Sequence, residues 1–165
     1  MRCLSCGRDG LPMSVEICPN AKCGSYIPAL MRDLLPHGTH LTTYHIDYPL
    51  GRGGFGVTYR AHHTLLDEPR AIKEFYPRDF VMRDPTTGHV TVPHCEVEDY
   101  RRGLERFVCE GRLLARLHHP GVVDVHDLFE VNGTAYLVME LIPGDTLEVE
   151  LERAGGKLPP ARARA

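Results

Sequence analysis

Residues 44–75 read YHIDYPLGRGGFGVTYRAHHTLLDEPRAIKEF, and this stretch decides the fold. Apolar and polar residues alternate over 44–50 and again over 57–61, which predicts two β-strands on either side of a glycine-rich turn. A third strand is expected over 70–75, with Lys73 inside it. Glycines in such a turn expose backbone N–H groups and remove Cβ atoms, so phosphate oxygens can approach the main chain. The stretch therefore predicts a phosphate-binding hairpin followed by a lysine that neutralises phosphate charge.

Two other interpretations of the glycine turn have to be weighed. A dinucleotide-binding Gly-x-Gly-x-x-Gly motif opens a helix, and residues 57–63 have no helical pattern, which argues against that reading. A bare hairpin turn without any ligand would explain the glycines taken alone. Lys73 favours the phosphate site over the bare turn, because the loop and the ammonium group support each other.

The chain after this stretch supplies one helix and two more strands. Leucines and phenylalanine recur at helical spacing over residues 100–117, which predicts an amphipathic helix whose acidic residues are Glu105 and Glu110. Two apolar runs, 122–131 and 134–141, flank Asn132-Gly133, a strong hairpin signal. The prediction is an α+β domain with a five-stranded antiparallel sheet and one helix.

The segment from Leu50 to Lys73 resembles the ATP-binding signature of eukaryotic-type Ser/Thr protein kinases of bacteria. In that family the helix carries a glutamate, then leucines, then His-Pro, and the run from Glu110 to Pro120 is similar. The resemblance covers residues 44–152 and implies a kinase small lobe and hinge. It implies that Lys73 binds the α/β-phosphates of ATP and pairs with Glu110, with Glu105 as the alternative partner.

The same resemblance implies the contacts to ATP. Met139 would be the gatekeeper, and the backbones of Glu140 and Ile142 would pair with the adenine edge. Thr58 stands where the family usually has valine, which keeps the shape but adds a hydroxyl. The residues expected to bind the nucleotide are Leu50, Gly51, Arg52, Gly53, Gly54, Phe55, Gly56, Thr58, Ala71, Lys73, Met139, Glu140 and Ile142.

The catalytic loop and the magnesium-binding segment of the family do not occur in residues 1–165. A kinase takes its base and its Mg²⁺ ligands from His-Arg-Asp-x4-Asn and Asp-Phe-Gly, and Asp79-Phe80-Val81 has no glycine and precedes the helix. We therefore expect a truncated kinase. Transfer of the ATP γ-phosphoryl group to protein Ser or Thr belongs to the intact family, and we expect no turnover from this chain alone. The alternative is a non-catalytic nucleotide-binding or kinase-interacting module.

Four of the six cysteines lie within residues 1–30, as Cys3-x2-Cys6 and Cys18-x4-Cys23. Two such pairs on tight turns can converge on a tetrahedral ion, which predicts a zinc-ribbon-like module. Four thiolates leave no open coordination position, so the metal would be structural. The few apolar residues here imply that the metal supplies the folding free energy. Iron of the rubredoxin type and reduced cysteines in a disordered head are the alternatives.

Composition, apolar runs and the positions of turn-forming residues set the remaining expectations. A formal net charge of −3 gives no basic excess for nucleic acid, and a DNA-binding ribbon is disfavoured. No apolar run is long enough for a membrane span and no signal core follows Met1, so a cytoplasmic protein is expected, with a protein substrate or docking partner. Residues 31–42 are expected to be a linker, 43–152 the lobe and hinge, and 153–165 an unstructured tail. The histidines are expected to be structural or on the surface, with His62 and His63 in a turn.

Overall fold

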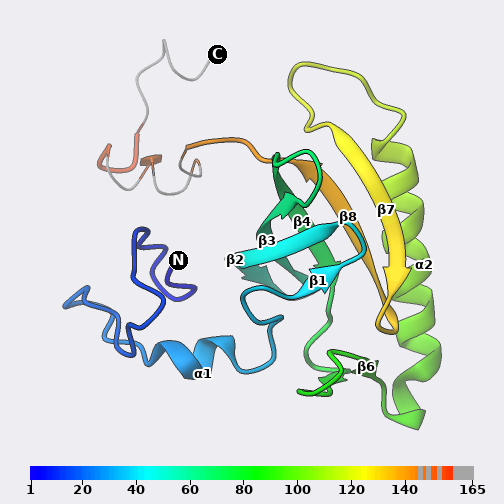
Figure 1. Ribbon diagram of the computed structural model, residues 1–165, viewed down its shortest axis with the longest axis horizontal. Coiled ribbons are helices and arrows are strands. Elements are labelled where there is room, and N and C mark those ends of the chain that lie inside the picture. The colour runs from blue at the N-terminus through cyan, green and yellow to red at the C-terminus, as the bar shows by residue number, and fades with distance from the viewer. Residues whose placement is uncertain (145–146, 148–149, 152–153, 158–165) are drawn as a thin grey trace.

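The computed structural model describes residues 1–144, 147, 150–151 and 154–157. Its main element is a six-stranded antiparallel sheet in the order β1-β2-β3-β4-β8-β7, and the long helix α2 runs beside β7 (Figure 1). The strands are β1 (His40–Leu41), β2 (Tyr44–Gly53), β3 (Gly56–His63), β4 (Pro69–Phe75), β7 (Val125–Val131) and β8 (Thr134–Glu140). The α+β class is therefore confirmed, and most of the expected tail lies outside the described residues.

The smaller elements lie before and after the first four strands. Helix α1 (Ile27–Met31) follows the four-cysteine segment, and β5 (Met82–Arg83) pairs with β6 (Val90–Thr91) in a separate two-stranded sheet. The 3-10 turn η1 (His94–Glu96) leads into α2 (Val97–Leu114). The hairpin between β7 and β8 turns at Asn132 and Gly133, both with positive φ, as the Asn-Gly signal predicts.

The sheet has six strands where five were predicted, because a short strand forms within the segment expected to be a linker. Its residues His40 and Leu41 form β1 against β2. Leu34 and Leu35 are buried in the main core, and the Leu35 N–H donates to the Tyr59 hydroxyl oxygen at 3.2 Å. A strand of two residues is too short to show alternation, so sequence patterning could not detect it.

The strand register separates two faces of the sheet. Thr58, Lys73 and Leu137 lie directly opposite one another on β3, β4 and β8, and we call their side of the sheet the lysine face. The other side of the sheet, which we call the core face, carries the side chains of the residues next to these along each strand. Among them, Tyr59 and Ile72 are 0% exposed. The core face is thus sealed by the main hydrophobic cluster, while the lysine face is only partly covered.

Helix α2 covers the β7–β8 end of the lysine face. Its first and last residues each come three positions before those of the predicted helix, residues 100–117, and turns continue from Ala115 to Leu117. Two glycines let the helix approach closely: a Cβ on Gly103 would lie 2.7 Å from Phe75 Cζ, and one on Gly111 would lie 3.0 Å from Leu137 Cδ1. A larger residue at Gly103 would require Phe75 or the helix to move, and one at Gly111 would require Leu137 to shift by a few tenths of an ångström.

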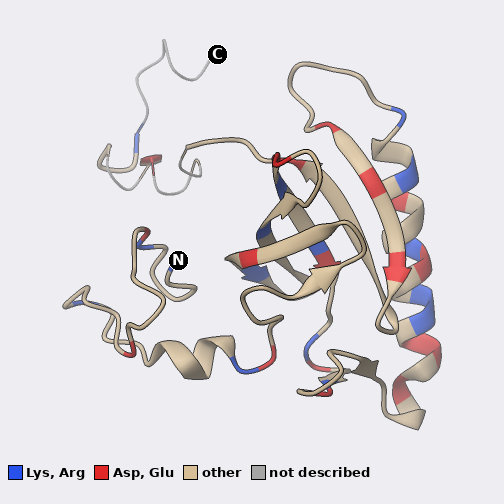
Figure 2. Ribbon diagram, viewed as in Figure 1, with Lys and Arg blue, Asp and Glu red and all other residues tan. Residues whose placement is uncertain are grey.

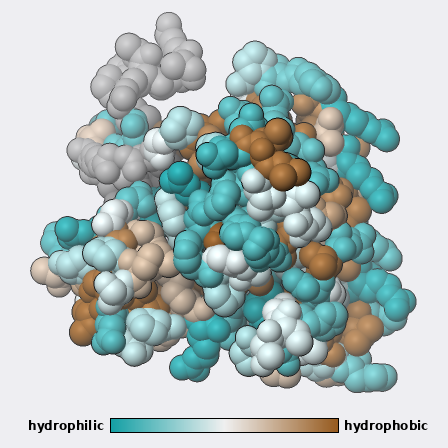
Figure 3. Space-filling model, viewed as in Figure 1, coloured by the Kyte–Doolittle hydropathy of each residue, from teal (hydrophilic) through white to brown (hydrophobic). Residues whose placement is uncertain are grey.

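The surface carries charges of both signs. Acidic and basic residues are interspersed along the outer side of α2 (Figure 2), and polar residues surround scattered apolar ones on the face drawn in Figure 3. No helix in the described part of the chain combines the length and the apolar content that a bilayer crossing requires.

Candidate functional site

The glycine turn joins β2 to β3, with Gly53 opposite Gly56. A Cβ on Gly51, Gly53 or Gly54 would meet nothing within 4 Å, and none of these three has a positive φ. The fold therefore does not require glycine at these positions, and the main chain there is open to an approaching group. Gly56 is different, because a Cβ on it would lie 2.2 Å from the Glu74 carbonyl oxygen.

The turn contains two residues with side chains, Arg52 and Phe55. The Phe55 side chain points away from the strands, and the Arg52 side chain points away from the lysine face. Phe55 stands at the tip and is 77% exposed. Arg52 pairs with Val57, a residue of the core face, and its Nη2 atom lies 3.7 Å from Asp33 Oδ2. Arg52 can therefore offer its main chain, and not its guanidinium, to a ligand on the lysine face.

The register gathers four of the expected nucleotide residues on the lysine face. Lys73 lies opposite Thr58, and Ala71, two residues before Lys73, lies opposite Met139. Leu50 sits at an irregularity in the pairing of β2 with β3 and is half-buried. An apolar floor therefore lies next to a cationic group and the open glycine turn.

The expected hinge follows β8. The Glu140 N–H donates to the Asp124 carbonyl oxygen at 2.9 Å, so it is used within the sheet. Ile142 is 61% exposed, and its backbone makes no main-chain hydrogen bond to any residue that the structure describes. The Ile142 backbone is thus not engaged in a main-chain hydrogen bond within the described part of the chain.

The predicted ion pair between Lys73 and Glu110 is not formed in this structure. Lys73 Nζ lies 5.8 Å from the centre of the Phe107 ring, a cation–π contact. Glu110 is exposed, and no carboxylate of the described residues lies within 4.0 Å of the ammonium group. Three helical residues turn through about 300°, so Glu110 lies about 60° around α2 from Phe107. Glu105, the alternative partner, is exposed as well.

A buried carboxylate on the core face was missed by the sequence analysis. Glu74 is 0% exposed and accepts hydrogen bonds from the Tyr59 and Tyr136 hydroxyls, each at 2.9 Å. Arg83 Nη2 donates to Glu74 Oε1 at 2.6 Å. Burial, and then the charge of Glu74, raises the pKa of both tyrosines, so they remain hydroxyl donors. Alternation could have revealed this residue, since Glu74 must face away from Lys73.

Arg83 joins three segments of the chain. In addition to its bond with Glu74, Arg83 donates from Nε to the Asp33 carbonyl oxygen at 3.0 Å and from Nη1 to the Gly88 carbonyl oxygen at 2.8 Å. Its guanidinium lies over the Tyr76 ring, 4.7 Å from the centroid. Desolvation works against the charged form, but Glu74 outweighs it and raises the pKa of Arg83. The segment between β4 and α2, residues 76–96, which we call the insert, is thereby fastened to the strand that carries Lys73.

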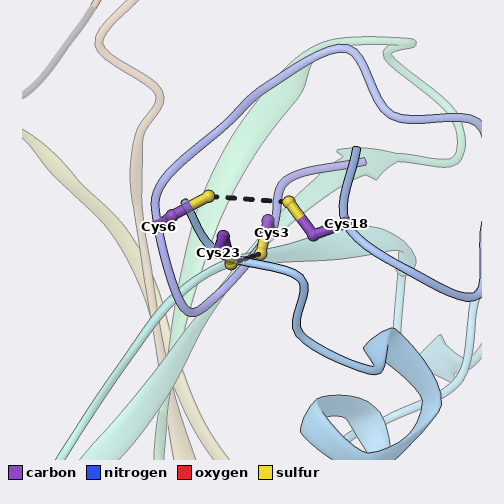
Figure 4. Close-up of side chains that lie close together, drawn as sticks. All are labelled: Cys3, Cys6, Cys18 and Cys23. Carbon is purple, nitrogen blue, oxygen red and sulfur yellow. Dashed lines mark hydrogen bonds between the residues drawn. The ribbon is translucent and has the colours of Figure 1, made fainter. Parts of the chain in front are cut away.

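The four N-terminal cysteines form a second candidate site. All four Sγ atoms lie within 4.8 Å of one another, with Cys3 to Cys23 at 3.9 Å and Cys6 to Cys18 at 3.6 Å (Figure 4). Four thiolates bound at 2.3 Å around one tetrahedral ion are about 3.8 Å apart. The observed sulfur spacing therefore fits such an ion.

Two similar turns hold these sulfurs. Cys6 and Cys23 are each followed by a glycine with positive φ, and the Gly7 N–H donates to the Cys3 carbonyl while the Gly24 N–H donates to the Asn20 carbonyl. In the metal-free cluster, hydrogen bonds from the Ser25 hydroxyl and backbone lower the pKa of Cys23 to about 6. The main chain at Asn20 lowers the pKa of Cys18, but burial and the neighbouring thiols outweigh it and raise that pKa to about 12.

The protein kinase domain family matches residues 44–165, so the chain belongs to the protein kinase family. It is 34% identical over 123 residues to the Ser/Thr-protein kinase PknH of Mycobacterium bovis, covering 74% of this chain and 18% of PknH. It is 32% identical over 123 residues to PknE of the same organism, of which it covers 19%. The chain thus spans about a fifth of these curated relatives.

Solved structures agree with this assignment. The apo form of PpkA-294 superposes with a TM-score of 0.75 at 33% identity, over 80% of this chain and 47% of that one. The PknI kinase domain of Mycobacterium tuberculosis matches with a TM-score of 0.52 at 23% identity over 78% of this chain and 44% of that one, which supports the fold alone. The resemblance to Ser/Thr kinases is confirmed, and the four-cysteine segment lies before the matched residues.

Proposed function

We propose that residues 44–144 are the ATP-binding half of a Ser/Thr protein kinase. The observation that carries the proposal is the open turn at Gly51, Gly53 and Gly54 beside Lys73, because the fold itself gives no reason for three glycines there. Backbone N–H groups of the turn would hold the phosphates, and the Lys73 ammonium would neutralise their charge. Ala71 and Met139 would contact the adenine ring, with the Ile142 amide at its edge.

In the whole protein this half would position ATP for transfer of its γ-phosphoryl group to a protein hydroxyl. Mg²⁺ supplies charge neutralisation between the phosphates in that reaction. The base and the Mg²⁺ ligands would come from residues other than 1–165, so this chain alone would bind nucleotide without transferring phosphate. Pairing of Lys73 with Glu110 would require α2 to turn by about 60° and replace the Phe107 contact.

Replacing Lys73 with alanine is expected to weaken binding of a fluorescent ATP analogue by the 165-residue chain at least about tenfold, since a charge-assisted contact is lost. Lys22→Ala is the matched control, because Lys22 is an exposed lysine of the four-cysteine segment. Equal affinities of the two variants would contradict the proposal. They would favour the alternative of a kinase-interacting module, which also predicts a stable complex with a second chain.

We further propose that the four-cysteine segment is a structural zinc module. The sulfur spacing supports a tetrahedral ion, and four thiolates leave no position for substrate. Met31, in α1, packs against both the cysteine cluster and the core of the lobe. The module would therefore present a fixed docking surface to a protein partner.

A further inference from the structure

Three histidines stand side by side on three neighbouring strands. His45 on β2 lies directly opposite His40 on β1 and directly opposite His62 on β3. Directly opposed residues of antiparallel strands have Cβ atoms about 4.5–5.5 Å apart, and their side chains share one face. The ring centres of His40 and His45 are 3.5 Å apart, and those of His45 and His62 are 5.3 Å apart. We call these three residues the histidine row.

The histidine row lies on the lysine face. His62 is four residues after Thr58 on β3, so both side chains point the same way and about 13 Å of strand separates them. In the strand order, β1, β2 and β3 lie at the opposite end of the sheet from β8 and β7, the strands that contact α2. His40 is exposed and the other two are partly exposed, so an ion from solvent can reach the row. His62 and His63 were expected in a turn, but they close β3.

Neighbouring side chains orient the imidazole rings of the histidine row. Asp47 Oδ1 lies 2.9 Å from His62 Nδ1, which fixes the orientation of that ring and leaves Nε2 to bind an ion. His37 adds a fourth imidazole to the neighbourhood, with its Nδ1 2.9 Å from the Asp47 carbonyl oxygen.

We propose that His40, His45 and His62 form a second metal site, which binds one divalent transition ion of the Zn²⁺ or Ni²⁺ class. Imidazole nitrogens suit these ions, which bind at about 2.0–2.1 Å in the case of zinc. The His40 and His45 rings meet edge to face at 79°. Among the described residues, the four cysteines are the one group whose ligand atoms already converge, so binding of an ion by the histidine row requires these rings to reorient about their side-chain torsions. Three protein ligands leave a coordination position open, unlike the four-cysteine cluster.

The test is a titration of the full chain with Ni²⁺ after its cysteine cluster has been loaded with one equivalent of Zn²⁺. We expect one equivalent of Ni²⁺ to bind with a dissociation constant in the micromolar range, on the order of 10 µM. Because Ni²⁺ is paramagnetic, the ring proton resonances of His40, His45 and His62 should broaden first. His45→Ala, and separately His40→Ala, should weaken Ni²⁺ binding at least about tenfold.

His126→Ala is the matched control, because His126 is an exposed histidine on β7 at the opposite edge of the sheet. Its affinity for Ni²⁺ should equal that of the unaltered chain. His40→Ala keeps the test decisive if His45→Ala fails to fold, since His40 is exposed on an edge strand. Absence of a Ni²⁺ equivalent, or binding that none of the row variants weakens, would overturn the proposal.

Discussion

Arg83→Met is expected to lower the free energy of unfolding by about 3–5 kcal/mol, because it leaves the Glu74 carboxylate buried without its cationic partner. Glu74 is 0% exposed and the Arg83 side chain is 4% exposed, so water cannot replace the lost contact. The change also removes the bonds to Asp33 and Gly88. Urea unfolding of the full chain, followed by circular dichroism, measures the effect.

Arg101→Met is the matched control for this prediction. Arg101 also pairs with a glutamate, Glu98, at 3.5 Å, but both side chains are largely exposed, at 63% and 74%. Exposed pairs contribute little to stability, so this variant should unfold close to the urea midpoint of the unaltered chain. Similar midpoints for Arg83→Met and Arg101→Met would show that the buried network does not stabilise the lobe.

Removing the zinc ion that we propose for the four cysteines is expected to have the other large effect, and it acts on residues 1–30. Binding free energies of structural zinc in small modules are about 10–16 kcal/mol at pH 7, more than the small cluster of Leu11, Ile27 and the cysteines can supply. Cys18→Ser, or a chelator, should therefore unfold this segment while the lobe persists. Amide hydrogen exchange should show lost protection for the segment and unchanged protection in β3 and β4.

Cys95→Ser provides the comparison for the zinc experiment, since Cys95 is exposed and outside the cluster. Its zinc content, measured by elemental analysis, should remain one ion per chain. Iron in place of zinc would identify the rubredoxin alternative. A Cys18→Ser chain that retains zinc and full protection over residues 1–30 would rule out a four-thiolate site.

The parts of the fold that sequence alone could predict are those with a strong local pattern. The alternation over 44–50 and 57–61, the Asn132-Gly133 turn and the helical spacing after residue 100 each correspond to an observed element. The helix was misplaced by three residues at each end, because η1 and the acidic residues Glu98 and Asp99 begin it before its first leucine. Element ends are fixed by contacts that periodicity does not record.

The candidate sites divide in the same way. Cysteine spacing is local, and the four predicted ligands do converge. Arg83, the partner of Glu74, lies in the insert. The insert has no helical or strand periodicity in its sequence, so the hydrophobic pattern could not identify Arg83. Glu110 matches a family position in sequence, but the rotation of α2 about its axis depends on packing at Gly103, Phe107 and Gly111, which placed Phe107 against Lys73.

The fastening of the insert by Arg83 also bears on limited proteolysis. The turn from Asp84 to Gly88 is largely exposed, and exposed loop tips are preferred sites of cleavage. A cut there would separate β4 from β8 in sequence, yet the two strands remain paired along 70–74 and 136–140. We therefore expect the two fragments to elute as one species under native conditions and to part only in denaturant.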